Sequence, residues 1–138
     1  MIIDATNLIL GRMGTEVAKK ALLGEKIDIV NCEKAVITGK KSVIFEKYKS
    51  LDDRGTTQWG PFMQKHPDRF VRRSIRGMLG YKKSRGREAY RRIMCYKGLP
   101  EMFAGKEIKT IESAKLVEKA GLKYLTVKQL TDLLKIKN

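Results

Sequence analysis

Arginines and lysines are the residues of this chain whose number and spacing point most directly to chemistry. Eleven basic residues and one acid, Glu88, fall between positions 69 and 97, so this segment supplies +10 of the chain's net charge of +15. Arginine donates two parallel hydrogen bonds to a phosphate group, and clustered positive charge attracts polyanions. The segment therefore predicts a surface that binds nucleic acid. Its basic residues are Arg69, Arg72, Arg73, Arg76, Lys82, Lys83, Arg85, Arg87, Arg91, Arg92 and Lys97.

A second interpretation of this segment is a solvated cationic face that keeps the protein soluble. Solubility is usually served by charges of both signs scattered over a surface, whereas these charges share one sign and one stretch of the chain. We therefore favour nucleic acid as the partner. Structured RNA and duplex DNA stay open at this point, and a free-standing DNA-binding protein is one alternative function.

Catalytic and metal-binding chemistry has few candidates in this sequence. His66 is the only histidine, which excludes metal sites built from several histidines and a proton relay between two of them. Cys32 and Cys95 lie far apart and lack the CxxC spacing of metal-binding or redox-active cysteines, so we expect buried, unpaired thiols. We expect no catalytic residue, no metal and no cofactor, and hence no enzymatic activity.

A nucleotide-using α/β enzyme is the other alternative, because Gly11 and Gly14 follow the first apolar segment of the chain. These glycines lack the GxGxxG spacing that brings a backbone onto a pyrophosphate, and the sequence contains no GxxxxGK[ST] loop. A role in helix packing is therefore favoured for both glycines.

Length and composition indicate a globular protein. A chain of 138 residues with 42% hydrophobic and 33% charged residues suffices for one domain with a core, and we expect residues 1–138 to form a single domain. No apolar run approaches the roughly 18 residues that a membrane span needs. The N-terminus lacks the basic start of a signal peptide, so we expect a cytoplasmic protein without membrane contact.

The hydrophobic periodicity predicts an α/β fold. Residues 1–5 and 26–30 have the apolar character of buried strands, and residues 10–22 between them repeat apolar positions at helical spacing up to Gly24. Strand, helix and strand at these lengths predict a parallel pair of strands joined by a helix. Residues 35–37 extend or follow the second strand, and a second helix over residues 40–49 is expected to bury Val43, Ile44 and Tyr48.

The basic segment itself is predicted to begin with an amphipathic helix after Pro67. At about 100° per residue, Arg69, Arg72, Arg73 and Arg76 fall within an arc of roughly 100°. The apolar side of this helix is expected to consist of Phe70, Val71, Ser74, Ile75, Met78 and Leu79.

Further elements follow the basic helix. A basic turn over residues 81–86 precedes a short helix, and residues 93–96 read as a strand. Near the end of the chain, Thr126 and Gln129 form a capping box before a last amphipathic helix.

Residues 52–66 show no apolar periodicity and form a long irregular segment, which is usually functional in a small domain. The basic RNA-binding segment is accordingly placed at about residues 52–98. Arg54 and Lys65 are candidates for phosphate contacts. Trp59 and Phe62 are suited to stacking on bases, although a single aromatic beside a Gly-Pro turn equally serves to anchor a loop.

Several motifs resemble one known family. Residues 75–80, 82–87 and 93–98, in this order, closely resemble the signature of the thirteenth large-subunit ribosomal protein family. Residues 10–19 are similar to the helix that follows the opening strand in that family. The approach to Pro67 through residues 60–62 resembles its archaeal and eukaryotic branch, and the short chain favours the archaeal type.

This resemblance implies a fold and a role. The fold would be a three-layer, Rossmann-like α/β/α architecture with a four-stranded, mainly parallel sheet. The function would be that of a structural constituent of the large ribosomal subunit, which binds ribosomal RNA and supports early subunit assembly. Its partners would be ribosomal RNA and neighbouring ribosomal proteins, with the protein monomeric within the ribosome. The arginine helix, the turn at residues 82–87 and the region of Gly60 would face RNA.

One position departs from the family pattern. Gly80 stands where the family usually has proline. Glycine leaves the backbone freer than proline does, so the turn after the arginine helix is expected to be looser than in relatives.

Overall fold

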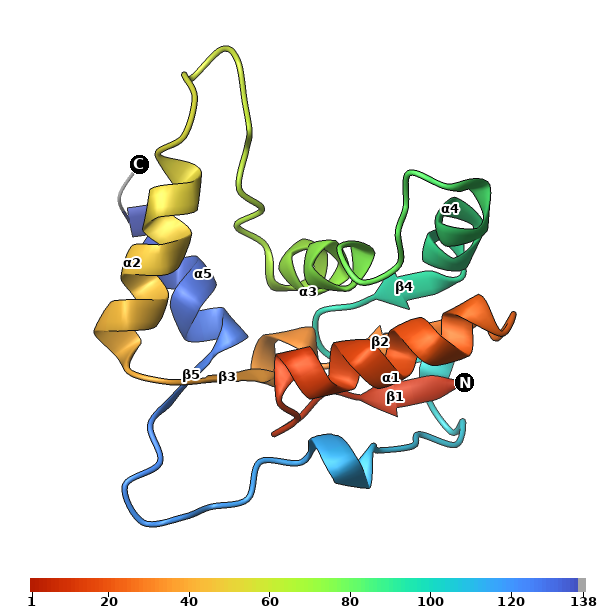
Figure 1. Cartoon of the computed structure of the whole chain (residues 1–138). Helices are drawn as coiled ribbons and strands as arrows, with labels where there is room; N and C mark the ends of the chain where they lie inside the picture. Colours follow the sequence, from red (N-terminus) through yellow and green to blue (C-terminus); the bar gives the residue numbers. More distant parts are fainter. Residues whose placement is uncertain (137–138) are drawn as a thin grey trace.

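A sheet of three parallel strands forms the centre of the molecule. The computed structural model describes residues 1–136 and shows a mixed α/β protein (Figure 1). The sheet contains β1 (Ile2–Asp4), β2 (Ile27–Val30) and β4 (Ile93–Cys95), in the order β1-β2-β4. All neighbouring strands run parallel, as expected for strands joined by helical crossovers.

Helix α1 (Leu10–Leu22) makes the first crossover, between β1 and β2. Its buried residues include Met13, Val17 and Ala21, which recur at the spacing of one helical face. Gly24 follows with a φ of 103°, a conformation that glycine adopts without strain and that commonly ends helices. The predicted strand-helix-strand unit is confirmed.

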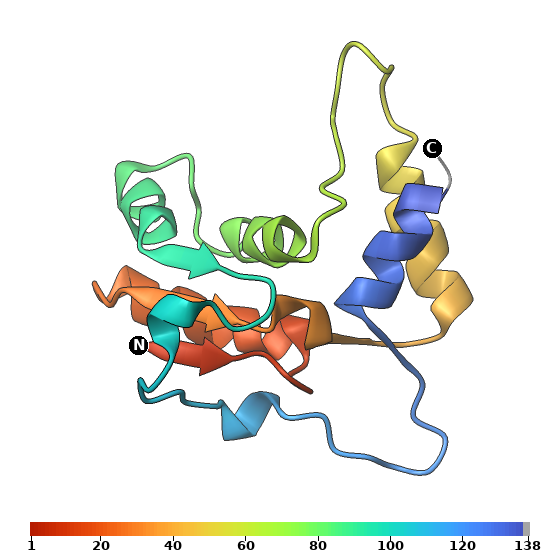
Figure 2. The same ribbon diagram turned by 180° about the vertical axis from the view of Figure 1, so that it is seen from behind.

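A second, two-stranded sheet joins distant parts of the chain. Strand β3 (Val36–Thr38) pairs antiparallel with β5 (Tyr124–Thr126). Each strand leads into a helix, α2 (Lys41–Asp52) and α5 (Val127–Ile136), and these two helices contact each other. Figure 2 shows them side by side at one end of the molecule.

The capping box before α5 is confirmed. The backbone N–H of Thr126 donates to the Gln129 side chain at 3.1 Å, and the backbone N–H of Gln129 donates to the Thr126 hydroxyl at 3.2 Å. Val127, Leu130 and Leu134 are buried behind this cap.

The basic segment folds into α3 (Pro67–Arg76) and α4 (Ser84–Arg91), which both contact α1 and β4. Short 3-10 turns occur at Cys32–Lys34, Glu101–Phe103 and Glu112–Ala114. The basic helices are therefore anchored to the core of the protein, and the next segment of chain, β4, is a strand of the central sheet.

The expected four-stranded, mainly parallel sheet with Rossmann-like layering is not confirmed. The parallel sheet has three strands. Beyond β1, the chain adds an isolated parallel bridge at Lys109, whose N–H donates to the Ile2 carbonyl at 2.8 Å while its carbonyl accepts from the N–H of Asp4 at 2.9 Å. Residues 35–37 were expected to extend or follow the second strand; the observed strand β3 covers residues 36–38 and pairs instead with β5.

The strand register gives a physical reason for this difference. Ile3, Ile29 and Cys95 form one row across the sheet, and all three are buried. The adjacent row on the opposite face contains Asp28, which is partly exposed, and Met94, which is exposed. A strand between two helical layers is buried on both faces, and these strands are fully buried on one face only.

Two predictions about buried side chains were wrong. Val43 of α2 is 59% exposed, and Phe45, which was not predicted, packs against the core beside Ile44 and Tyr48. Met78 lies beyond the end of α3 and is exposed, because the helix ends at Arg76 rather than continuing with the same face inward.

The two cysteines are free and buried, as predicted. The fold brings them together: a hydrogen bond with Cys32, together with burial, raises the pKa of Cys95 well above its ordinary value. Both thiols therefore belong to the apolar core. Within residues 1–136, no helix combines the length and the apolar character that crossing a membrane requires.

Candidate nucleic-acid interface

Helix α3 places four arginines on a strongly amphipathic element. Pro67 occupies the first helical turn, where its missing N–H costs nothing, and Phe70, Val71 and Ile75 turn toward the core. This burial fixes the rotation of the helix, so the arginines lie on the remaining faces. Arg69 and Arg73 are exposed, whereas Arg72 and Arg76 are partly buried.

Arg72 is bound within the protein. Its Nε donates to the carbonyl of Ile93 at 2.9 Å, and one terminal nitrogen donates to the carbonyl of Tyr90 at 3.3 Å. The guanidinium also lies over the Tyr90 ring, 4.0 Å from the ring centroid. Arg72 thereby fastens α3 to the junction of α4 and β4.

The guanidinium groups of Arg92 and Arg87 also donate hydrogen bonds to backbone carbonyls. Arg92 reaches the carbonyl of Ala21, near the C-terminus of α1, at 3.0 Å, and Arg87 reaches the carbonyl of Lys82 at 2.9 Å. A cation at a helix C-terminus interacts favourably with the helix dipole. Arg92 is partly buried, while Arg87 stays exposed.

Arg76 is held differently, by an aromatic ring. Its guanidinium lies 4.1 Å from the centroid of Tyr81, and its Nε is buried without a hydrogen-bond partner among residues 1–136. A buried donor without a partner costs free energy unless a ligand satisfies it. Together, Gln64, Arg69, Arg72, Arg73, Arg76 and Tyr90 line a hollow of about 320 Å³, which we name the arginine hollow.

A second, more apolar hollow of about 410 Å³ adjoins the first one. We name it the apolar hollow; Tyr48, Phe62, Met63 and Phe70 contribute apolar surface to it. The Tyr48 and Phe70 rings meet edge to face with centroids 5.2 Å apart. Burial raises the pKa of Tyr48, so its ring is neutral at physiological pH.

The irregular segment between α2 and α3 is confirmed, since residues 53–66 contain no helix or strand. This segment arches away from the body of the molecule (Figures 1 and 2). Trp59 is 77% exposed and Phe62 is 66% exposed, so neither ring anchors the arch in the core. Phe62 lines the apolar hollow and Trp59 does not.

Gly60 leaves room for the Phe62 ring in its observed place. A Cβ at Gly60 would come within 2.8 Å of that ring, which real side chains do not tolerate. Glycine at this position therefore lets the ring fold back onto the backbone. Gly60 acts here as a positioning residue for an exposed aromatic side chain.

The two basic residues predicted in this segment differ in their surroundings. Arg54 is exposed and lines the apolar hollow. Lys65 is partly buried, and its ammonium lies 3.3 Å from the carboxylate of Asp52 at the end of α2. This ion pair closes the base of the arch, so Lys65 has a partner inside the protein.

The turn between α3 and α4 and the outer side of α4 complete the positive surface. Lys82, Lys83, Arg85, Arg87 and Arg91 are all exposed. No ion pair within residues 1–136 involves them: the pairs that occur there are formed by Lys19, Lys65 and Lys115.

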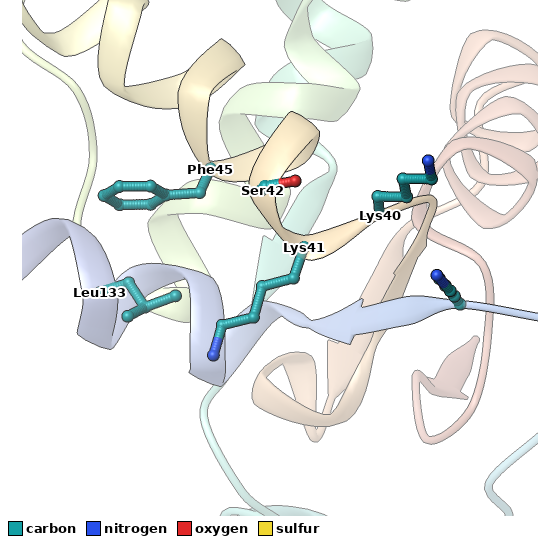
Figure 3. Close-up of a pocket in the computed structure, with 6 residues that line it drawn as sticks. Lys40, Lys41, Ser42, Phe45 and Leu133 are labelled. Carbon is teal, nitrogen blue, oxygen red and sulfur yellow. The ribbon is translucent and has the colours of Figure 1, made fainter.

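A separate hollow of about 560 Å³ lies at the start of α2. Figure 3 shows Phe45 and Leu133 on one side of it, contributed by α2 and α5, with Lys40, Lys41 and Ser42 at the beginning of α2. These lysines add positive charge outside the segment that the sequence singled out.

Sequence reasoning did not assign several residues of the two adjoining hollows to the site, among them Tyr48, Met63, Gln64 and Tyr90. Tyr81 and Tyr90 had a detectable signal, because aromatic rings among arginines commonly stack on guanidinium groups. Nothing in the spacing of Tyr48 and Gln64 could have placed them beside α3.

Clusters of potential metal-ligating side chains are absent from the described part of the chain. Residues 1–136 contain no group of three or more His, Cys, Asp or Glu side chains that could hold a metal ion. His66 is exposed at the start of α3 and makes no capping hydrogen bond.

Comparison with known proteins decides the family. The family model described as ribosomal protein L13 matches residues 1–102, which include the three strands of the parallel sheet and both basic helices. The chain belongs to the ribosomal protein L13 family. The resemblance identified from the sequence motifs is confirmed.

Relatives from archaea match most of the chain, in agreement with the predicted archaeal type. The large ribosomal subunit protein uL13 of Archaeoglobus fulgidus is 48% identical over 132 residues, covering 94% of this chain and 84% of the relative. Those of Methanosarcina barkeri and Methanococcoides burtonii are 43% and 41% identical, and their matches cover 94% and 91% of this chain and of each relative.

Gly80 lies in the turn between the two basic helices. Gly80 has a φ of +60°, which proline cannot adopt because its ring fixes φ near −65°. The Gly80 carbonyl accepts a hydrogen bond from the N–H of Lys83 at 3.0 Å, which closes the turn. Gly86 packs so closely beneath this turn that a Cβ there would overlap the carbonyl oxygens of Leu79 and Gly80.

Proposed function

We propose that this protein is a structural constituent of the large ribosomal subunit and binds ribosomal RNA. Family membership and the names of the relatives support this role. The observation that carries RNA binding is the set of exposed basic side chains from α3 to the end of α4, which we name the basic surface. It consists of Arg69, Arg73, Lys82, Lys83, Arg85, Arg87 and Arg91.

The contacts within the protein divide the predicted site residues into two groups. Arg72, Arg92 and Lys65 are partly buried, have partners in the protein and position the elements of the interface, as does Gly60. Arg87 also donates a hydrogen bond within the protein but is exposed, so it belongs to the basic surface. The basic surface, with Arg54, Arg76, Trp59 and Phe62, contacts the RNA. The protein acts as a monomer in the cytoplasmic ribosome, beside neighbouring ribosomal proteins, and supports early assembly of the subunit.

The two alternative functions receive no support from a specific observation. The sequence left open a nucleotide-using enzyme and a free-standing DNA-binding protein. Membership of a ribosomal protein family favours neither of them.

Salt dependence of RNA binding tests the proposal. If the seven side chains of the basic surface neutralise phosphates, the logarithm of affinity for a large-subunit ribosomal RNA fragment should fall against the logarithm of salt concentration with a slope of about −5 to −6. Filter binding over a salt series measures this slope. A slope near zero would mean that the basic surface is not the interface.

A further inference from the structure

The apolar hollow and the arginine hollow are neighbours that share two residues. Gln64 and Arg73 line both hollows, so the two spaces meet along one boundary. One side of this boundary is largely aromatic and apolar, and the other side is lined by guanidinium groups. A ligand that spans both hollows therefore needs an apolar part next to an anionic part.

The apolar hollow has the chemistry of a site for a planar ring. Phe62 lies at its exposed edge, while Tyr48 and Phe70 are more deeply buried and already pack on each other. Its volume of about 410 Å³ falls in the range of small-ligand sites, roughly 300 to 1,000 Å³. Unpaired bases of RNA are commonly bound by stacking on such side chains.

The arginine hollow has the chemistry of a phosphate site. Arg72 and Arg76 are held in place by Tyr90 and Tyr81, so their planes are fixed before a ligand arrives. The buried Nε of Arg76 is a donor without a partner among residues 1–136. Arginine presents its donors in a planar fork that matches two oxygens of a phosphate group.

We propose that the two hollows together bind one unpaired nucleotide of RNA, with its base in the apolar hollow and its phosphate at Arg73 and Arg76. This inference rests on the proposed function and adds the kind of RNA feature that the protein selects. An apolar side chain of a neighbouring protein is the other conceivable occupant of the apolar hollow. The positive charge around both hollows, including Arg54 at the edge, favours RNA.

Two RNA hairpins of equal length and charge test the proposal, one fully paired and one with a single bulged nucleotide. The full-length protein should bind the bulged hairpin about tenfold more tightly, which lies within the range of base stacking on one aromatic ring. Phe62→Ala should abolish this preference, whereas Tyr124→Ala, which removes an exposed ring outside both hollows and outside the proposed interface, should leave it unchanged.

A second variant tests the site by filling the apolar hollow, without deleting an aromatic side chain. Gly77 lines the apolar hollow, has an ordinary helical φ of −61°, and a Cβ there would make only ordinary contacts, the closest at 3.6 Å. Gly77→Leu should therefore fill the hollow without changing the charge and should remove the preference for the bulge. Gly11→Leu is the matched control, because no heavy atom lies within 4 Å of a Cβ at that position.

The outcomes separate this inference from the proposed function. Equal affinity of the unmodified protein for both hairpins, with the salt slope intact, would overturn the nucleotide site and leave ribosomal RNA binding standing. If Gly77→Leu also failed to enter subunits in that case, the hollow would belong to a protein neighbour. Absence of binding to either hairpin and to ribosomal RNA would overturn the proposed function itself.

Discussion

Adjacent arginines on α3 should respond to substitution in opposite ways. Arg72 donates two hydrogen bonds to backbone carbonyls and stacks on Tyr90, whereas Arg73 is exposed. Replacing Arg72 with alanine should therefore destabilise the protein, and replacing Arg73 should weaken RNA binding with little effect on stability. The two variants remove the same side chain from neighbouring positions of one helix.

The size of the Arg72 effect follows from its contacts. A hydrogen bond from a charged donor contributes about 1.5 to 3 kcal/mol, and the 3.3 Å bond belongs at the weak end of that range. Stacking on the tyrosine adds about 0.5 to 1 kcal/mol. Because Arg72 is partly exposed, solvent screening reduces the total, and we expect Arg72→Ala to lower the free energy of unfolding by about 2 to 4 kcal/mol.

Urea unfolding followed by circular dichroism measures this change. With a slope of about 2 kcal/mol per molar urea, the midpoint for Arg72→Ala should fall by about 1 to 2 M. Arg73→Ala should stay within about 0.5 kcal/mol of the unmodified protein. In RNA binding, Arg73→Ala should reduce the magnitude of the salt slope by about 1.

The substitution Arg72→Lys separates geometry from charge. A lysine side chain would keep the positive charge but has no planar fork to reach two carbonyls while stacking on a ring. Arg72→Lys should therefore be destabilised nearly as much as Arg72→Ala. Unchanged stability of both Arg72 variants would refute the assignment of Arg72 as an internal fastener, and a large loss of stability in Arg73→Ala would refute the exposed role of its neighbour.

Two further predictions concern the basic surface and the turn that supports it. Arg69→Glu combined with Arg73→Glu should abolish filter binding to ribosomal RNA at moderate salt, while the charge-matched change of Lys40 and Lys41 to Glu should reduce it much less; equal losses would mean that net charge alone determines binding. Gly86→Ala should cost about 1 to 3 kcal/mol in urea unfolding, because its Cβ would overlap two carbonyl oxygens, and native stability of this variant would contradict the close packing of α4 on the turn.

Local periodicity was enough to predict most elements of this fold. The helix over residues 10–22, the parallel pairing of the first two strands and the cap at Thr126 all depend on residues close in sequence. Strand β5 was missed, because three residues that pair only with β3 carry too short a pattern to be recognised. The separation into two sheets depends on that same long-range pairing.

The sequence predicted which residues make up the candidate site. It did not predict which of them bind within the protein and which are exposed to a ligand. Clustered arginines indicated an anion-binding surface, and the family motifs agreed with it. From the sequence, Arg72 and Arg73 were predicted to have the same role, because helical periodicity places both on one arc of the helix surface. Their roles differ because the carbonyls of Tyr90 and Ile93 lie beside one of them, and that placement results from the packing of β4 against α3.

The internal contacts of the arginines also bear on how the surface binds. A free arginine side chain carries about 2 kcal/mol of rotamer entropy, much of which is lost when it grips a ligand. Stacking on Tyr90 and Tyr81 removes part of this freedom from Arg72 and Arg76 during folding. The Arg76 guanidinium therefore loses less entropy when an anion arrives than the exposed Arg69 does, while Arg72 stays bound within the protein. Fixed arginines thus favour one geometry of the bound phosphate, whereas mobile ones contribute attraction with little geometric preference.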